Sequence, residues 1–76
     1  MPKLGFIYTR HVLDRMSQRG ITKKRVEEAI AKAQTFEPLL EGKRKATYKR
    51  KGKKSLIIIY TPKGKKLAII STYYDN

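Results

Sequence analysis

Residues 55–61 read Ser-Leu-Ile-Ile-Ile-Tyr-Thr, and this dense apolar run decides the fold. Its length and its β-branched and aromatic side chains are typical of a buried central strand. Turn-forming residues stand on both sides, because Lys51-Gly52-Lys53-Lys54 precedes the run and Pro62-Lys63-Gly64-Lys65 follows it. The segments beyond these turns, residues 44–50 and 67–74, are also predicted to be strands. The second half of the chain therefore predicts a three-stranded antiparallel meander.

The first half of the chain has a helical period instead. Thr9 is a suitable N-cap for a first helix over residues 9–20, whose apolar stripe consists of Val12, Leu13 and Met16. Gly20 provides a left-handed stop, and Thr22 caps a second helix predicted over residues 22–35. The buried face of this second helix follows the i, i+3, i+4, i+7 pattern and consists of Val26, Ala29, Ile30 and Ala33.

Helices followed by strands indicate an α+β fold. We expect residues 1–76 to form a single domain in which two N-terminal helices pack on one face of the three-stranded antiparallel sheet. A segment from Leu4 to Tyr8 can add a fourth strand. A chain of 76 residues buries only about 60% of the surface that it exposes when unfolded, so we expect a small stability margin.

The composition is strongly basic, with 19 Lys and Arg against 6 Asp and Glu and a formal net charge of +13. Such a charge suits nucleic acid, an anionic membrane surface, or solubility alone. A membrane-surface protein needs a basic amphipathic helix, whereas the densest basic cluster here lies on a predicted strand and turn, which favours nucleic acid. The sequence has no Cys and a single His, which excludes thiolate and paired-His metal sites. We therefore expect no metal and no other cofactor.

The longest apolar run, residues 56–60, is too short to span a bilayer, and the N-terminus has no signal-peptide pattern. We therefore expect a cytoplasmic protein without membrane association. Few Asn and Gln beside abundant Lys, Arg, Glu and Ile indicate a thermophilic source. The alternative explanation of the charge is a solvated surface on a heat-adapted protein, although such proteins usually balance Lys with Glu.

Three side chains form what we call the cationic stripe of the first predicted helix: His11, Arg15 and Arg19. Their i, i+4, i+8 spacing places them on one side of a helix, at the edge of its apolar face. Arg15 and Arg19 can bind phosphate with planar forks, and His11 is the only side chain that exchanges a proton near neutral pH. The alternative is structural: the arginines cap carboxylates or carbonyls within the fold, and His11 is an ordinary helix-start residue.

A second candidate surface is the basic hairpin between the first two predicted strands. Its members are Lys43, Arg44, Lys45, Tyr48, Lys49, Arg50, Lys51, Lys53 and Lys54. Closely spaced cations around one aromatic ring suit an RNA backbone with one stacked base. The alternative is a solvated edge, since Lys also protects edge strands from aggregation. Because the density of cations exceeds what edge protection needs, we predict nucleic-acid binding by this hairpin.

The first helical segment also resembles a known family. The run Thr9-x-His11-Val12-x-x-Arg15-Met16-x-x-Arg19-Gly20-Ile21-Thr22, followed by Val26 and Ala29-Ile30, is similar to the signature of a small bacterial and archaeal domain family of unknown function. That family is grouped with the barnase–EndoU–colicin–RelE superfamily of metal-independent ribonuclease toxins. The match is specific over residues 9–30 and weak over the strands, where it rests on their order and on Ser71-Thr72-Tyr73.

The resemblance implies a RelE- or barnase-like fold with a ribonuclease site between the first helix and the sheet. It assigns catalysis to His11, Arg15 and Arg19, with Thr72 and Tyr73 placed less securely. RNA carries its own nucleophile, the 2′-OH, so cleavage without a metal needs a base, cations for the developing charge, and an acid. His11 can be either base or acid.

The second acid or base can be a Lys of lowered pKa or one of Tyr48, Tyr60, Tyr73 and Tyr74. Alternate strand residues face opposite sides, so only one of Tyr73 and Tyr74 can face the helices, and the resemblance favours Tyr73.

Three functions stay open from the sequence. The first is a metal-independent endoribonuclease of the toxin type, which forms 2′,3′-cyclic phosphate ends and acts on free RNA or on the ribosome. The second is a non-catalytic module that binds RNA or DNA. The third is an interaction domain for an acidic protein partner such as an antitoxin. The presence of His11 favours the endoribonuclease over the binding module, because RNA cleavage needs an acid or a base and binding alone has little use for a titratable group.

Overall fold

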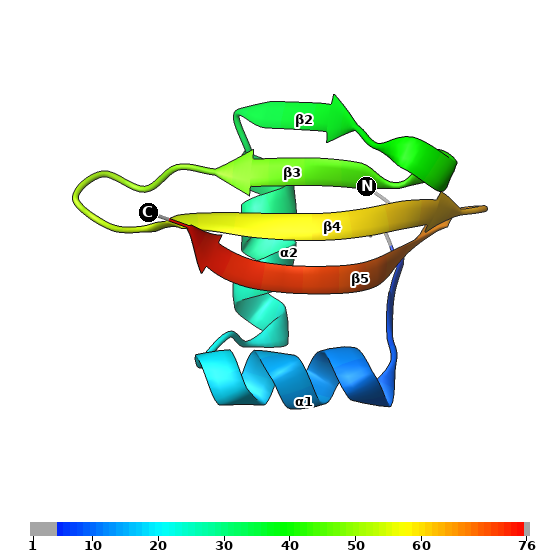
Figure 1. The fold of residues 1–76 in the computed structure, drawn as a ribbon, viewed down its shortest axis with the longest axis horizontal. Coiled ribbons are helices and arrows are strands. Elements are labelled where there is room, and N and C mark those ends of the chain that lie inside the picture. Colours follow the sequence, from blue (N-terminus) through cyan, green and yellow to red (C-terminus); the bar gives the residue numbers. More distant parts are fainter. Residues whose placement is uncertain (1–4, 76) are drawn as a thin grey trace.

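The chain, as a computed structural model, is described over residues 5–75. Its elements are β1 (Gly5–Tyr8), α1 (Arg10–Arg19), α2 (Lys23–Lys32), β2 (Thr35–Pro38), the 3₁₀ turn η1 (Leu40–Gly42), β3 (Arg44–Tyr48), β4 (Ser55–Lys63) and β5 (Lys66–Asp75). The strands form one sheet in the order β1-β5-β4-β3-β2. Figure 1 shows α2 behind this sheet and α1 along its edge, beside β5.

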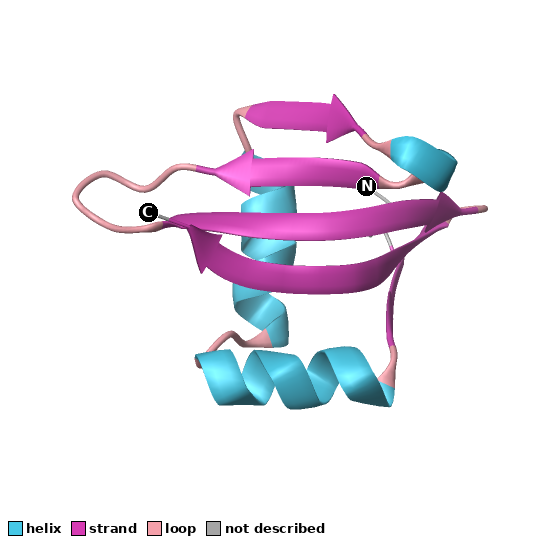
Figure 2. Cartoon of the chain, in the orientation of Figure 1, coloured by secondary structure: helices cyan, strands magenta, loops and turns pink. Residues whose placement is uncertain are grey.

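The expectation of a three-stranded, or at most four-stranded, antiparallel sheet is wrong, because the sheet has five strands and is mixed (Figure 2). The meander of β3, β4 and β5 forms its centre. On one side, β1 pairs with β5 in parallel, with Gly5 opposite Lys66 and Tyr8 opposite Ile69. Leu4, the first residue of the expected N-terminal strand, lies outside the described residues.

On the other side of the meander, β2 pairs antiparallel with β3. This strand occupies residues that follow α2, where the sequence predicted the second helix to continue to residue 35. The helix ends at Lys32 because Ala33 has an extended backbone, with φ −59° and ψ 139°. Pro38 is tolerated as the last residue of β2 because an edge strand can do without one backbone N–H.

Local chemistry explains where the two helices begin. The hydroxyl of Thr9 accepts a hydrogen bond from the N–H of Val12 at 3.2 Å, and the hydroxyl of Thr22 accepts one from the N–H of Arg25 at 3.1 Å. Gly20 ends α1 with φ 68°, a conformation that costs a glycine little. The chain then turns at residues 20–22 into α2, which lies across the direction of α1 (Figure 1).

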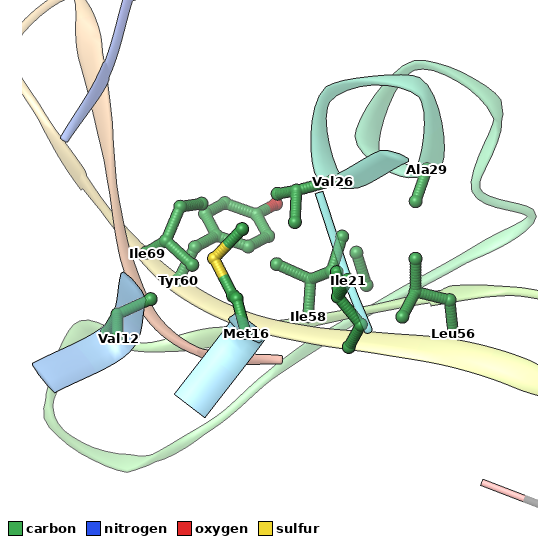
Figure 3. Close-up of a cluster of buried hydrophobic side chains, with 10 residues drawn as sticks. Val12, Met16, Ile21, Val26, Ala29, Leu56, Ile58, Tyr60 and Ile69 are labelled. Atoms are coloured by element: carbon green, nitrogen blue, oxygen red, sulfur yellow. The ribbon is translucent and has the colours of Figure 1, made fainter. Parts of the chain in front are cut away.

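The core lies between the helices and the covered face of the sheet (Figure 3). Val12 and Met16 of α1 and Val26 and Ala29 of α2 are buried. They pack against Leu56, Ile58, Tyr60 and Ile69 from β4 and β5. Burial of these apolar side chains is the main favourable term for a chain of this size.

The register shows which residues of β5 face the helices. A bulge lies in this pair of strands, because Tyr60 is opposite Ile69 while Ile59 is opposite Ser71, which leaves Ile70 as the extra residue. Beyond the bulge, Thr72 is opposite Ile58 of the core. Opposed residues share a face of a sheet, so Thr72 lies on the helix side.

Candidate active site between α1 and β5

Within residues 5–75, the part of β5 from residue 70 to residue 75 has no strand on its outer side. β1 pairs with β5 only as far as Ile69, and after Tyr8 the chain turns into α1. Helix α1 then runs beside the remainder of β5 (Figure 1). Backbone polar groups that another strand would have covered therefore face a helix instead.

A cavity of about 260 Å³ lies at this junction. Its walls are His11, Val12, Arg15 and Arg19 from α1, with Ile70, Ser71 and Thr72 from β5. It is slightly smaller than the roughly 300–1,000 Å³ of pockets for small molecules, so it suits one phosphate with part of its sugar. The structure thus brings all three members of the cationic stripe to one cavity.

Arg19 connects the helix to the strand edge. Its Nη1 donates a hydrogen bond of 2.9 Å to the backbone carbonyl of Thr72. A guanidinium has five N–H donors, so this bond leaves others for a ligand. The one ion pair within residues 5–75 joins Lys43 Nζ to Glu41 Oε2 at 3.9 Å, so none of those residues forms an ion pair with the stripe.

The structure separates Tyr73 from the cavity. Tyr73 is opposite Ile57, on the face of the sheet that the helices do not cover, whereas Tyr74 is opposite Leu56 and faces the helices. The sequence reasoning correctly limited the choice to one of the two, but the choice of Tyr73 does not agree with the register. Thr72, the residue before Tyr73, lines the cavity instead.

The nine residues of the basic hairpin do not form one surface. Lys43, Arg44 and Lys45 lie at the start of β3, and residues 49–54 form the loop beyond its other end. Arg44 and Lys45 also point to opposite faces of the sheet, because they are adjacent strand residues. Tyr48 packs against the core on the helix side. In Figure 1 the loop projects beyond the sheet, at the end where β5 finishes.

Two side chains hold this loop in place. Arg50 donates from Nε and Nη2 to the carbonyl of Lys54, at 3.4 and 3.3 Å, and its guanidinium lies 5.2 Å from the centre of the Tyr74 ring. The side-chain amide of Gln34 exchanges two hydrogen bonds with the backbone of Lys49, at 2.9 and 3.2 Å. Arg50 therefore has a structural role. The exposed cations of the loop are Lys49, Lys51, Lys53 and Lys54.

Sequence reasoning missed a polar cluster at Tyr8. The Tyr8 hydroxyl donates to Glu27 Oε2 at 3.4 Å, and Lys23 Nζ lies 5.4 Å from the centre of the ring. Burial raises the pKa of Tyr8 well above its usual range, and the Glu27 carboxylate raises it further. Tyr8 is therefore unsuited to accept or release protons near neutral pH.

Two further observations concern the part of the chain that the structure describes. Among residues 5–75, no group of three or more His, Cys, Asp or Glu side chains is arranged to hold a metal ion. In the same range, neither α1 nor α2 is long and apolar enough to cross a membrane.

The fold is shared with a known toxin. Comparison with solved structures finds the crystal structure of the Brucella abortus ribonuclease toxin BrnT, with a TM-score of 0.75 and 17% sequence identity over 97% of this chain and 99% of that chain. At this level of identity the likeness concerns the fold. Comparison with curated proteins finds no match.

A family model matches nearly the whole chain. The model, described as Domain of unknown function (DUF4258), covers residues 8–76, which include the cationic stripe on α1 and the whole of β5. The protein therefore belongs to the family described as Domain of unknown function (DUF4258).

Proposed function

We propose that this protein is a metal-independent endoribonuclease of the toxin type and that the cavity between α1 and β5 is its active site. One observation carries the proposal: the only imidazole of the chain and two arginines line the same cavity. The BrnT-like fold supports it. The proposal places the protein in the cytoplasm, where its substrate is free RNA or RNA on the ribosome.

The chemistry needs few protein groups. His11 accepts the proton of the 2′-OH, and the oxygen attacks the adjacent phosphorus. Arg15 stabilises the negative charge that develops on the phosphate oxygens, together with the donors that Arg19 has left. The bond to the 5′ oxygen breaks, which leaves a 2′,3′-cyclic phosphate and a 5′-OH. DNA lacks the nucleophile, so this mechanism favours RNA.

The leaving 5′ oxygen also needs a proton. Tyr73 cannot supply it from the opposite face of the sheet, and His11, which acts as the base, is the only imidazole, carboxylic acid or phenol among the cavity walls. We therefore assign this proton to solvent, which reaches the exposed His11 and Arg15. Without a positioned acid among residues 5–75 the enzyme should be slow, because such a group contributes roughly 10²–10⁴-fold to the rate.

Lysines of the 49–54 loop are proposed to guide the RNA backbone. The contact between Arg50 and Tyr74 places the loop near the end of β5, two residues beyond Thr72. An RNA strand lying along β5 would therefore pass from the cavity to the loop. Lys43, Arg44 and Lys45, at the other end of β3, are less well placed to contact the same strand.

The decisive experiment is incubation of the purified protein with end-labelled RNA in EDTA, followed by analysis of the product ends. We expect cyclic or 3′-phosphate ends and 5′-OH ends, and a loss of roughly 10²–10⁴-fold in His11→Ala with RNA affinity almost unchanged. Arg15→Gln should also lose activity. Arg10→Gln is the matched control, because Arg10 is an exposed arginine of the same helix outside the cavity.

Other outcomes favour the alternatives. If the wild type binds RNA but cleaves it neither free nor on translating ribosomes, the non-catalytic binding module replaces the enzyme. If it binds neither RNA nor DNA, an acidic protein partner such as an antitoxin becomes the better proposal. An exposed apolar surface that a protein partner could cover lies along β2 and the turn after it, where Phe36, Leu39 and Leu40 are exposed.

A further inference from the structure

Thr72 has a hydroxyl that the fold does not use. The residue is only 1% exposed, and its Oγ1 has no hydrogen-bond partner among residues 5–75. It lies on the helix side of β5, opposite Ile58, and belongs to the wall of the cavity. Most buried polar atoms in native proteins are paired, so an unpaired one calls for an explanation.

Stability does not explain this hydroxyl. A buried hydroxyl without a partner is unfavourable, and Val has nearly the same shape as Thr without this penalty. The neighbours of Thr72 on the covered face are apolar, as Ile58 and Ile69 show. A residue that lowers stability in a core is best explained by a role in binding.

The backbone N–H of Thr72 is a second hydrogen-bond donor beside the cavity, as the position of its carbonyl shows. Its carbonyl points to the outer edge of β5, where it accepts the hydrogen bond from Arg19. In an extended strand the N–H and C=O of one residue point to the same side, so the Thr72 N–H also faces this edge. β1 ends its pairing at Ile69, so no strand covers the edge here.

We propose that Thr72 binds a non-bridging phosphate oxygen of the RNA in the cavity, through its N–H and its hydroxyl, beside the guanidinium groups of Arg15 and Arg19. This contact requires the buried Oγ1 to turn toward the cavity by a change of χ1 between staggered rotamers. This inference rests on the proposed function for the identity of the ligand. It assigns Thr72 a contact with substrate that the apolar surroundings of its side chain do not suggest.

The test compares Thr72→Val, which removes only the hydroxyl, with Thr72→Ser, which keeps it. The probe is a 2′-O-methyl RNA oligonucleotide, which cannot be cleaved because its nucleophile is blocked. We expect Thr72→Val to melt at the same temperature or higher and to bind the probe about tenfold more weakly, as for a lost hydrogen bond to a charged group. Thr72→Ser should bind like the wild type. Thr72→Ala serves as the second apolar variant if the valine chain does not fold.

Thr61→Val is the matched control. It also removes one strand hydroxyl, but that hydroxyl donates to the carbonyl of Gly42 at 3.1 Å and lies outside the cavity. This variant should lose a little stability and no affinity. Thr72 would have no role in binding if Thr72→Val kept its affinity for the probe, or if Thr72→Ser lost as much as Thr72→Val.

The outcomes also separate this inference from the proposed function. If the wild type does not cleave RNA but Thr72→Val still weakens binding of the probe, the phosphate contact stands and the enzyme proposal fails. If the wild type cleaves RNA and Thr72→Val neither binds more weakly nor cleaves more slowly, the contact fails and the enzyme proposal stands.

Discussion

Replacement of Met16 tests the packing of α1, on which the position of the cationic stripe depends. Met16 is 2% exposed and lies among core residues of α2, β4 and β5 (Figure 3). Truncation of such a side chain to Ala costs roughly 2–5 kcal/mol, and about 3 kcal/mol is a reasonable value for a site with neighbours on three sides. The total stability of a chain of 76 residues is only about 4–11 kcal/mol.

The expected change in melting temperature follows from the size of the chain. An unfolding entropy of about 2.1 cal/mol/K per residue gives about 0.16 kcal/mol/K for 76 residues. A loss of about 3 kcal/mol therefore lowers Tm by about 20 °C in Met16→Ala. Met16→Asp places an unpaired charge in the core and should leave the chain unfolded at 25 °C. Both are measured by circular dichroism on heating.

Gln18→Ala provides the control, because Gln18 is an exposed residue of the same helix. Its free energy of unfolding should change by at most about 0.5 kcal/mol, which is about 3 °C. If Met16→Ala melts within 5 °C of the wild type, or if Met16→Asp stays folded, the phase of α1 is wrong. The cationic stripe would then not face β5.

Two further predictions concern charge. If the protein neutralises about four to six phosphates of a single RNA strand, the slope of log K against log[salt] should be about −3 to −4. Replacing Lys51, Lys53 and Lys54 together with Gln should make this slope shallower by about 2. A flat salt response in the wild type would contradict electrostatic binding. The pKa of Tyr8 is raised by burial and by Glu27, so its contribution to stability is complete below about pH 10, the ordinary value, and is lost as the pH rises through the higher value in the fold. Urea denaturation between pH 8 and pH 11 should show a steeper loss of stability in the wild type than in Tyr8→Phe, and equal slopes would refute the shift.

Features set by neighbours in the sequence were visible before the structure. The helix ends could be predicted because they depend on backbone groups within four residues of the capping residue. These capping residues are Thr9, Gly20 and Thr22. The cationic stripe depends only on the helical period of α1. The sequence could not show that the stripe faces β5, because this depends on which strand lies beside the helix.

The errors concern pairings between distant residues. β1 and β5 are separated by most of the chain, and no local pattern shows that they pair in parallel. β2 is four residues long and ends in Pro38, so it gives neither a long alternation nor a clear strand composition. No strand was therefore predicted at residues 35–38, and the second helix was extended to residue 35.

The resemblance favoured Tyr73, and a bulge in β5 is the reason that this residue does not face the helices. Ile69 faces the helices, and in a regular strand Ser71 and Tyr73 would do so as well, because alternate residues share a face. The extra residue at Ile70 reverses this alternation and turns Thr72 toward α1.

Pairing between β1 and β5 ends at the residue before this bulge. One position in β5 therefore both opens the strand edge that forms the cavity and selects the side chain that lines it. Because a bulge is set by how two strands fit together, the composition of β5 alone cannot reveal which of its polar residues reaches the site.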